Sequence, residues 1–213
     1  MGTPAEICAL APVIPVLIVE DLAHAAPLAE ALAAGGLPVL EVTLRTPAAL
    51  DVIRAMKRAA PGAVVGAGTL RTPADLAAAR AAGAEFGVSP GAPATLMDAV
   101  AKDGLPFLPG CATATEAMEL ADRGFEVVKF FPAEPAGGAP YLKSLASPLP
   151  GLRFCPTGGV TPENAPDYLK LPNVLVVGGS WVAPPGLMEK GDWAGIEALA
   201  REAVARLRPF QRA

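Results

Sequence analysis

The stretch EVVKFFP, Glu126–Pro132, is the part of the sequence from which both fold and chemistry can be argued. Its β-branched and aromatic residues predict a buried strand, which Pro132 ends. Lys129 stands in the middle of that strand, although an ammonium group is costly to bury without a partner. A buried lysine that is partly neutral is a nucleophile suited to form a Schiff base with a carbonyl carbon. The alternative is a lysine that extends into water or pairs with a structural acid.

Apolar runs rich in β-branched residues alternate with runs rich in alanine and leucine on both sides of this stretch. The expected strands are Val13–Val19, Val39–Leu44, Ala63–Ala67, Glu85–Val88, Pro106–Leu108, Val127–Phe131, Arg153–Pro156 and Val174–Val177. The expected helices are Pro4–Leu10, Ala23–Ala34, Pro47–Ala60, Ala94–Lys102, Thr113–Arg123, Gly137–Leu145 and Trp193–Leu207, with two further helix starts at Thr72-Pro73 and Thr161-Pro162. Threonine followed by proline, as also at Thr46-Pro47, is typical of the first positions of a helix.

The alternation amounts to eight units of strand followed by helix. Such an order predicts a parallel sheet with right-handed crossovers. Eight units in one domain, residues 1–213, predict a closed (β/α)8 barrel of the TIM type. The alternative fold, an open doubly wound sheet, would require a GxGxxG turn after the first strand and a break in the order of units. The sequence shows neither feature.

Composition excludes several classes of protein. The 213 residues are 52% hydrophobic and 18% charged, with a net charge of -4 and no basic cluster, so nucleic acid is not an expected partner. No apolar run approaches the roughly 20 residues of a membrane-spanning helix, and no signal peptide is seen, so a cytoplasmic protein is expected. The three cysteines lack CxxC spacing, which argues against disulfides and against a zinc site. With His24 as the one histidine, mechanisms that need two histidines are excluded.

Polar residues fall on one face of the second expected strand. Side chains alternate between faces of a strand, so Glu41, Thr43 and Arg45 share the face opposite to the neighbouring apolar residues. In a barrel this polar face points toward the mouth, where the active site lies at the carboxyl ends of the strands. Lys129 falls on the corresponding face of its own strand and is expected to share a cavity with Glu41. A structural bridge between Glu41 and Arg45 is the alternative.

Other strand ends offer further candidates. The third strand ends in Gly66-Ala67-Gly68-Thr69, where the glycines give a ligand access and Thr69 supplies a hydroxyl. That threonine could equally be a turn or capping residue. Ser89-Pro90-Gly91 and Pro109-Gly110-Cys111 read as tight turns that shape the mouth. Without a histidine partner, Cys111 and Cys155 are expected to be packing residues and not nucleophiles.

Paired glycines follow the seventh and eighth strands, in Cys155-Pro156-Thr157-Gly158-Gly159 and Val177-Gly178-Gly179-Ser180-Trp181. Barrels of this type build a phosphate site in these two loops from backbone N–H groups. Glycine lets the backbone approach the ligand, and Ser180 can add a hydroxyl. The alternative is that the glycines only form tight turns.

Six motifs together resemble one family. They are EVTLRT (41–46), GAGT (66–69), SPG (89–91), VKFFPAE (128–134), FCPTGG (154–159) and GGSW (178–181). In combination they resemble the 2-keto-3-deoxy-6-phosphogluconate (KDPG) aldolases, a class I family that also handles 4-hydroxy-2-oxoglutarate (KHG). The resemblance extends from Pro12 to Leu207.

The resemblance implies a homotrimeric (β/α)8 barrel that cleaves KDPG to pyruvate and glyceraldehyde 3-phosphate in the Entner–Doudoroff pathway, with neither metal nor cofactor. It implies that Lys129 is the Schiff-base lysine and Glu41 the general acid and base. Arg45 and Thr69 match the residues that hold the pyruvyl carboxylate, and Gly158, Gly159 and Ser180 match the phosphate binders. The full set of expected substrate-binding residues is Arg45, Thr69, Pro90, Phe131, Gly158, Gly159, Gly179 and Ser180.

Two rival functions share the barrel. A phosphate-sugar isomerase or decarboxylase would use the same phosphate loops but a different acid and base set, commonly His or paired Asp and Lys. The single histidine and the lack of an Asp-x-Lys strand end argue against it. A non-catalytic barrel that binds a phosphorylated sugar acid as a sensor would have no use for a buried Lys–Glu–Arg set.

Overall fold

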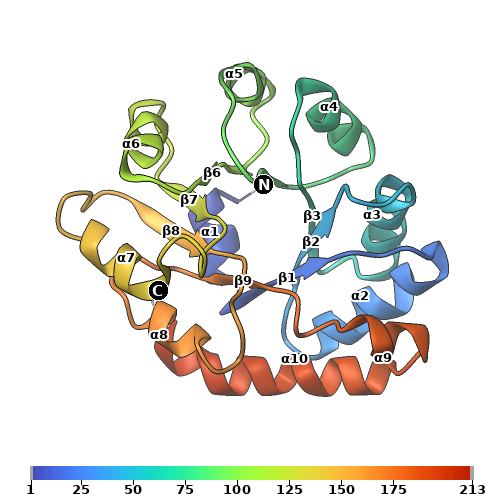
Figure 1. The fold of residues 1–213 in the computed structure, drawn as a ribbon. Coiled ribbons are helices and arrows are strands. Elements are labelled where there is room, and N and C mark those ends of the chain that lie inside the picture. The colour runs from blue at the N-terminus through green and yellow to red at the C-terminus, as the bar shows by residue number, and fades with distance from the viewer. Residues whose placement is uncertain (1, 212–213) are drawn as a thin grey trace.

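The computed structural model describes residues 2–211 (Figure 1). Its strands are β1 (Val13–Leu17), β2 (Val39–Thr43), β3 (Val64–Gly68), β4 (Gly87–Val88), β5 (Phe107–Leu108), β6 (Gly110–Cys111), β7 (Val127–Phe130), β8 (Arg153–Pro156) and β9 (Val177–Gly179). Its α-helices are α1 (Pro4–Ala9), α2 (Ala25–Ala34), α3 (Ala49–Ala59), α4 (Pro73–Ala81), α5 (Ala94–Asp103), α6 (Ala114–Asp122), α7 (Gly138–Leu145), α8 (Ala165–Leu169), α9 (Pro185–Glu189) and α10 (Trp193–Leu207). The short 3-10 helices are η1 (Leu22–His24) and η2 (Arg208–Phe210).

Helix starts follow local capping chemistry in several of the predicted places, and Thr3 and Glu6 form a reciprocal capping pair at the start of α1. The Thr72 side chain accepts a hydrogen bond from the Asp75 N–H, and the Asp75 carboxylate accepts one from the Thr72 N–H. Thr113 and Glu116 form the same reciprocal pair at the start of α6. Each pair satisfies N–H groups that the first turn of a helix cannot bond internally. The predicted start at Thr72-Pro73 is therefore confirmed.

Two other predicted helix starts are wrong. Helix α3 begins at Ala49 rather than Pro47, because the Thr46 hydroxyl donates to the Val19 carbonyl, 2.8 Å away, instead of capping the helix. Helix α8 begins at Ala165 rather than near Pro162. There the Thr161 hydroxyl accepts from the N–H groups of the next turn and forms a local turn before the helix.

The strands form two parallel sheets. The larger has the order β5-β4-β3-β2-β1-β9, and the smaller has the order β6-β7-β8. Figure 1 shows helices from α2 to α10 surrounding these strands, with α1 inside the ring. An isolated parallel bridge between Thr157 and Gly178 joins the end of β8 to β9. The expected parallel α/β fold is thus confirmed at this level.

Two regions differ most from expectation. The fifth expected strand, Pro106–Leu108, is β5, which pairs with β4. The tight turn expected at Pro109-Gly110-Cys111 is wrong, because Gly110–Cys111 forms a further strand, β6, which pairs with β7. The last strand begins at Val177 and not at Val174, because the register with β1 pairs Val13 with Val177. Val174 instead forms an isolated bridge with Phe154.

Burial divides the apolar residues into two clusters, one on each side of the strands. Leu40, Val42, Val128 and Phe130 belong to the cluster that also holds the buried helix residues. Alternate strand residues such as Val39 and Val127 form a smaller inner cluster with Ile7 and Cys8 of α1. Because Val39 and Val127 are the first residues of their strands, α1 covers the amino ends of the strands. The carboxyl ends are left for the site.

Within residues 2–211, no helix combines the length and the apolar character that a membrane crossing requires.

Candidate active site

The site is centred on Lys129 of β7 and Glu41 of β2. The Lys129 Nζ atom lies 3.2 Å from Glu41 Oε1, and their side chains are only 5% and 4% exposed. Both residues lie on the inner face, opposite the apolar residues that pack under the helices. A side chain at Gly68 of β3 would overlap the Glu41 carboxylate, so glycine is required there. The ammonium and the carboxylate compensate each other in a dry interior, where either charge alone would be costly.

Apolar and weakly polar groups surround the pair. The Phe131 ring centroid is 5.5 Å from Lys129 Nζ. Cys155 of β8 is the register neighbour of Lys129. Burial raises the pKa of Cys155 to about 12, an effect that nearby Lys129 opposes, and burial likewise raises the pKa of Cys111 to about 12. Both thiols therefore keep their protons at neutral pH, and a thiol is a poor nucleophile.

Arg45 and Thr69 meet just beyond the carboxyl ends of β2 and β3. The Arg45 Nε–H donates to the Thr69 hydroxyl, 3.1 Å away. Among residues 2–211 the guanidinium has no other hydrogen bond, so its remaining N–H groups are available to a ligand. The described contacts pair Glu41 with Lys129 and Arg45 with Thr69, and the alternative bridge between Glu41 and Arg45 is not formed.

Thr69 has an unusual backbone. Its φ is +61°, whereas every other described residue with positive φ is a glycine. A β-branched residue in the left-handed region is strained and persists only where the surrounding structure holds it. This conformation brings the Thr69 hydroxyl to Arg45.

Pro90 lies next to the strand that neighbours Lys129. A side chain at Gly110, the register partner of Lys129, would overlap the Pro90 carbonyl group. Ser89 is fully buried, and its hydroxyl accepts a hydrogen bond from the Gly110 N–H at 3.4 Å. The turn after β4 is thus fixed against β6, with Pro90 half-buried beside it.

The Gly158–Gly159 loop carries unpaired donors. The carbonyls of Thr157, Gly158 and Gly159 accept hydrogen bonds from Ala133 N, Glu134 N and Asn164 Nδ2 at 2.8, 3.0 and 3.0 Å. In a trans peptide the N–H points opposite to the preceding carbonyl. Within the described residues, the N–H groups of Gly159 and Val160 donate to no acceptor. Two successive free N–H groups can hold an anion.

Positive φ values at Gly158 and Gly159, +98° and +78°, explain why glycine occupies both positions. A Cβ at Gly158 would lie 3.2 Å from the Phe131 ring. Phe131 therefore stands between Lys129 and this loop. The bridge of Thr157 to Gly178 brings the exposed Ser180 to the same edge of the sheet.

Gly179 was expected to bind the substrate, whereas Thr157 was not expected in the site. The Trp181 ring occupies the space that a side chain at Gly179 would need, so packing alone requires glycine at that position. Thr157 was not among the expected site residues, yet it is buried at the carboxyl end of β8, and its hydroxyl fills the space above Gly178. The signal that could have found Thr157 is its place between a strand and a glycine pair.

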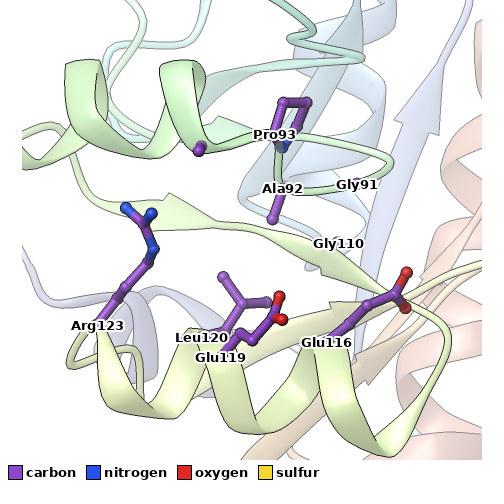
Figure 2. Close-up of a pocket in the computed structure, with 9 residues that line it drawn as sticks. Gly91, Ala92, Pro93, Gly110, Glu116, Glu119, Leu120 and Arg123 are labelled. Atoms are coloured by element: carbon purple, nitrogen blue, oxygen red, sulfur yellow. The ribbon is translucent and has the colours of Figure 1, made fainter.

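A separate cavity of about 370 Å³ lies outside this centre (Figure 2). Its walls are Gly91–Ala94 after β4, Gly110 of β6 and one face of α6, from which Arg123 reaches Asp98 of α5 at 2.9 Å. The lining contains none of the expected site residues. Over residues 2–211, no group of three or more His, Cys, Asp or Glu side chains is placed to hold a metal ion.

Comparisons with known proteins agree with this arrangement. The family model "KDPG and KHG aldolase" matches residues 5–199. The 2-dehydro-3-deoxy-phosphogluconate aldolase of Zymomonas mobilis is 55% identical over 196 residues, which cover 92% of this chain and 92% of that protein.

Two solved structures extend the comparison. The KDPG aldolase of Zymomonas mobilis with 3-phosphoglycerate is 54% identical, with a TM-score of 0.92 over 99% of this chain and 97% of that chain. The KDPG aldolase of Legionella pneumophila, with pyruvate captured as a covalent carbinolamine intermediate, is 43% identical, with a TM-score of 0.93 over 95% of this chain and 98% of that chain. Sequence and structure agree over nearly the whole length, and the chain therefore belongs to the KDPG and KHG aldolase family.

Proposed function

We propose that this chain is a class I aldolase that cleaves KDPG to pyruvate and glyceraldehyde 3-phosphate through a Schiff base on Lys129. The observation that carries the proposal is the buried pair of Lys129 and Glu41, 3.2 Å apart, in a member of this family. The Legionella relative captured with a carbinolamine supports the same covalent route. The rival isomerase, decarboxylase and sensor functions lack comparable support.

The reaction begins with addition of the Lys129 nitrogen lone pair to the C2 ketone. The ketone oxygen gains a proton, and the carbinolamine then loses water to become an iminium. Glu41 lies close enough to Lys129 Nζ to accept the proton that the amine gives up. The proposed chemistry uses no metal.

Cleavage follows from the iminium. Glu41 takes the proton of the C4 hydroxyl, the C4–O bond becomes the aldehyde carbonyl, and the C3–C4 electron pair moves to the iminium nitrogen. The resulting enamine is protonated at C3 by Glu41, and water releases pyruvate and free Lys129.

The substrate is held at two ends. Arg45, steadied by Thr69, offers a planar fork of N–H groups to the carboxylate, an arrangement that lysine could not reproduce. The free N–H groups of the Gly158–Gly159 loop and the hydroxyl of Ser180 bind the phosphate. Phe131 and Pro90 line the path between them, and Gly179 contributes through its backbone.

Reductive trapping tests the central step. Borohydride added with pyruvate should attach a three-carbon adduct to Lys129, located by mass analysis of peptides, and Lys129→Met should abolish both adduct and turnover while the fold is kept. Lys143→Met, a substitution on the exposed α7 surface, is the matched control and should retain both. An adduct on another lysine, or none in the wild type, would contradict the proposal.

A second activity has a specific basis in the family description, which names KHG aldolase as well. Cleavage of KHG to pyruvate and glyoxylate would use the same Lys129 adduct, because it breaks the corresponding bond of a shorter 4-hydroxy-2-keto acid. A retro-aldol assay with KHG, coupled to pyruvate detection, tests it.

We also propose that the two sheets close into one (β/α)8 barrel forming a single domain, and that three copies assemble. Closure is supported by the Thr157–Gly178 bridge and by the single residue, Pro109, that separates β5 from β6. Light scattering should give three times the chain mass of 21.5 kDa. A mass equal to one chain would exclude the trimer.

A further inference from the structure

Glu134 and Tyr168 make a contact beside the Gly158–Gly159 loop that no step of the proposed reaction uses. The Tyr168 hydroxyl, on α8, donates a hydrogen bond to Oε1 of Glu134, in the turn between β7 and α7. The Tyr168 side chain is fully buried. Burial raises the pKa of Tyr168, and the bond to Glu134 raises it further, so the phenol keeps its proton and remains the donor.

Glu134 touches the loop through both its backbone and its side chain. Its N–H donates to the Gly158 carbonyl at 3.0 Å. Its Cβ and Cγ atoms lie 2.7 Å from the position that a Cβ on Gly159 would occupy, so they pack directly on the Gly159 backbone. The carboxylate end is then anchored to Tyr168. A buried phenol thus fixes a side chain that lies against the loop.

Asn164 secures the loop independently. Its Nδ2 donates to the Gly159 carbonyl at 3.0 Å, and its Oδ1 accepts from the Thr161 N–H at 2.8 Å. The two glycines are therefore held by the turn after β7 and by the start of α8. Because the carbonyls of Gly158 and Gly159 face these supports, the N–H groups of Gly159 and Val160, which lie opposite them in the same peptide planes, face away.

We propose that Glu134 and Tyr168 are positioning residues, which hold the Gly158–Gly159 loop in the conformation that binds the phosphate ester of the substrate. This inference rests on the proposed function. Neither side chain needs to touch the substrate, and neither takes part in the chemistry at Lys129. Their effect should therefore be confined to ligands that carry a phosphate group.

Steady-state kinetics with KDPG and KHG test whether the effect is confined to the substrate that carries a phosphate. In Tyr168→Phe, KM for KDPG should rise about fivefold, the equivalent of one lost hydrogen bond, with kcat unchanged. KM for KHG, which has no phosphate, should stay at the wild-type value. The inhibition constant of inorganic phosphate against KDPG should rise by the same factor as KM.

Two matched variants distinguish loss of the Tyr168–Glu134 hydrogen bond from a general disturbance of the structure. Glu134→Gln keeps an acceptor oxygen and the packing on Gly159, so its KM for KDPG should be close to wild type. Tyr141→Phe removes a phenol hydroxyl from α7 that, among residues 2–211, makes no hydrogen bond, and it should change neither KM. If Tyr168→Phe fails to fold, Glu134→Ala carries the test, because Glu134 is exposed and its truncation leaves no buried cavity.

The outcomes distinguish this proposal from the one it rests on. An unchanged KM for KDPG in both Tyr168→Phe and Glu134→Ala, or an equal rise in KM for KDPG and KHG, would overturn the positioning role. Borohydride trapping of pyruvate on Lys129 is measured in the same proteins. Absence of the adduct from the wild type would overturn the aldolase proposal itself.

Discussion

Lys129 and Glu41 show how strongly a buried charge depends on its partner. Each side chain is almost inaccessible to water, and the two face each other across the interior. Removing either carboxylate or ammonium leaves the other group uncompensated, which costs more than the intact pair gains. For a Glu41 or Lys129 variant, the free energy of unfolding should therefore be measured together with the activity.

Thr69 provides a residue-scale prediction in which stability and ligand binding should change in opposite directions. Thr69→Gly relieves a left-handed conformation that costs a non-glycine residue about 1–2 kcal/mol. The greater conformational entropy of glycine in the unfolded state offsets about 0.5–1 kcal/mol of this gain, so the free energy of unfolding should rise by at most about 1.5 kcal/mol. Urea denaturation of Thr69→Gly and the wild type measures this change in the free energy of unfolding.

Binding should weaken in the same variant, because Arg45 loses its hydroxyl partner. The pyruvate concentration needed for half-maximal trapping on Lys129 should increase, whereas Thr69→Ser, which keeps the hydroxyl, should stay near wild type. A less stable Thr69→Gly protein with unchanged pyruvate dependence would show that neither the strain nor the contact matters.

Sequence reasoning reached some of these residues and not others, for physical reasons. Period-two alternation along β2 and β7 was sufficient to put Glu41 and Lys129 on inner faces. No alternation could indicate the positive φ of Thr69 or the bond between Tyr168 and Glu134, because both depend on segments distant in the chain. The catalytic and binding roles of the site residues stay predictions.

At the scale of single elements, the capping pair at the start of α6 predicts a local stability effect. Thr113→Ala removes the side chain that accepts the Glu116 N–H and should lower the free energy of unfolding by about 1 kcal/mol. Thr115→Ala, two residues later on the exposed helix surface, should leave it unchanged or slightly higher, since alanine favours helix. Equal losses in the two variants, measured by urea denaturation, would exclude a capping role for Thr113.

Helix starts also show what limits sequence reasoning about elements. Threonine followed by proline occurs before α1, α3, α4 and α8, but the threonine caps the helix only at α1 and α4. The Thr46 hydroxyl instead donates a hydrogen bond to the Val19 carbonyl of a neighbouring loop. The Thr161 hydroxyl accepts a hydrogen bond from Glu163 within a local turn. Such competition between partners is set by tertiary structure, and a pattern confined to two residues cannot resolve it.

For the whole molecule, the buried thiols predict loss of stability in alkaline solution. Cys111 and Cys155 hold their protons to about pH 12 in the folded state, against an ordinary pKa of 9.0. The unfolded chain therefore loses these protons first as pH rises, so the free energy of unfolding should fall between about pH 9 and 12. Below pH 9 both states are protonated and the contribution is fully present.

Urea denaturation from pH 8 to 11 measures this slope. Cys111→Ala should reduce the slope, because one raised pKa is removed, whatever its effect on stability at pH 8. An identical slope in Cys111→Ala and the wild type would show that this thiol does not contribute to the alkaline transition.

The order of elements in the whole chain was predictable, whereas the pairing details were not. Alternation of apolar and alanine-rich runs indicated parallel α/β units because each crossover needs a helix. The additional strand at Gly110–Cys111 and the start of β9 at Val177 depend on the register of neighbouring strands. Trimeric assembly and a cytoplasmic location stay predictions.

Helix α1 covers the amino ends of the strands, whereas the glycine loops lie at their carboxyl ends. In the proposed reaction, the substrate reaches the Lys129 amine, and both products leave it, at the carboxyl ends of the strands. The aldehyde product would occupy this route while the pyruvyl group is still covalently bound to the buried Lys129. Departure would then be sequential, aldehyde before keto acid, and the architecture would impose an obligatory order on turnover.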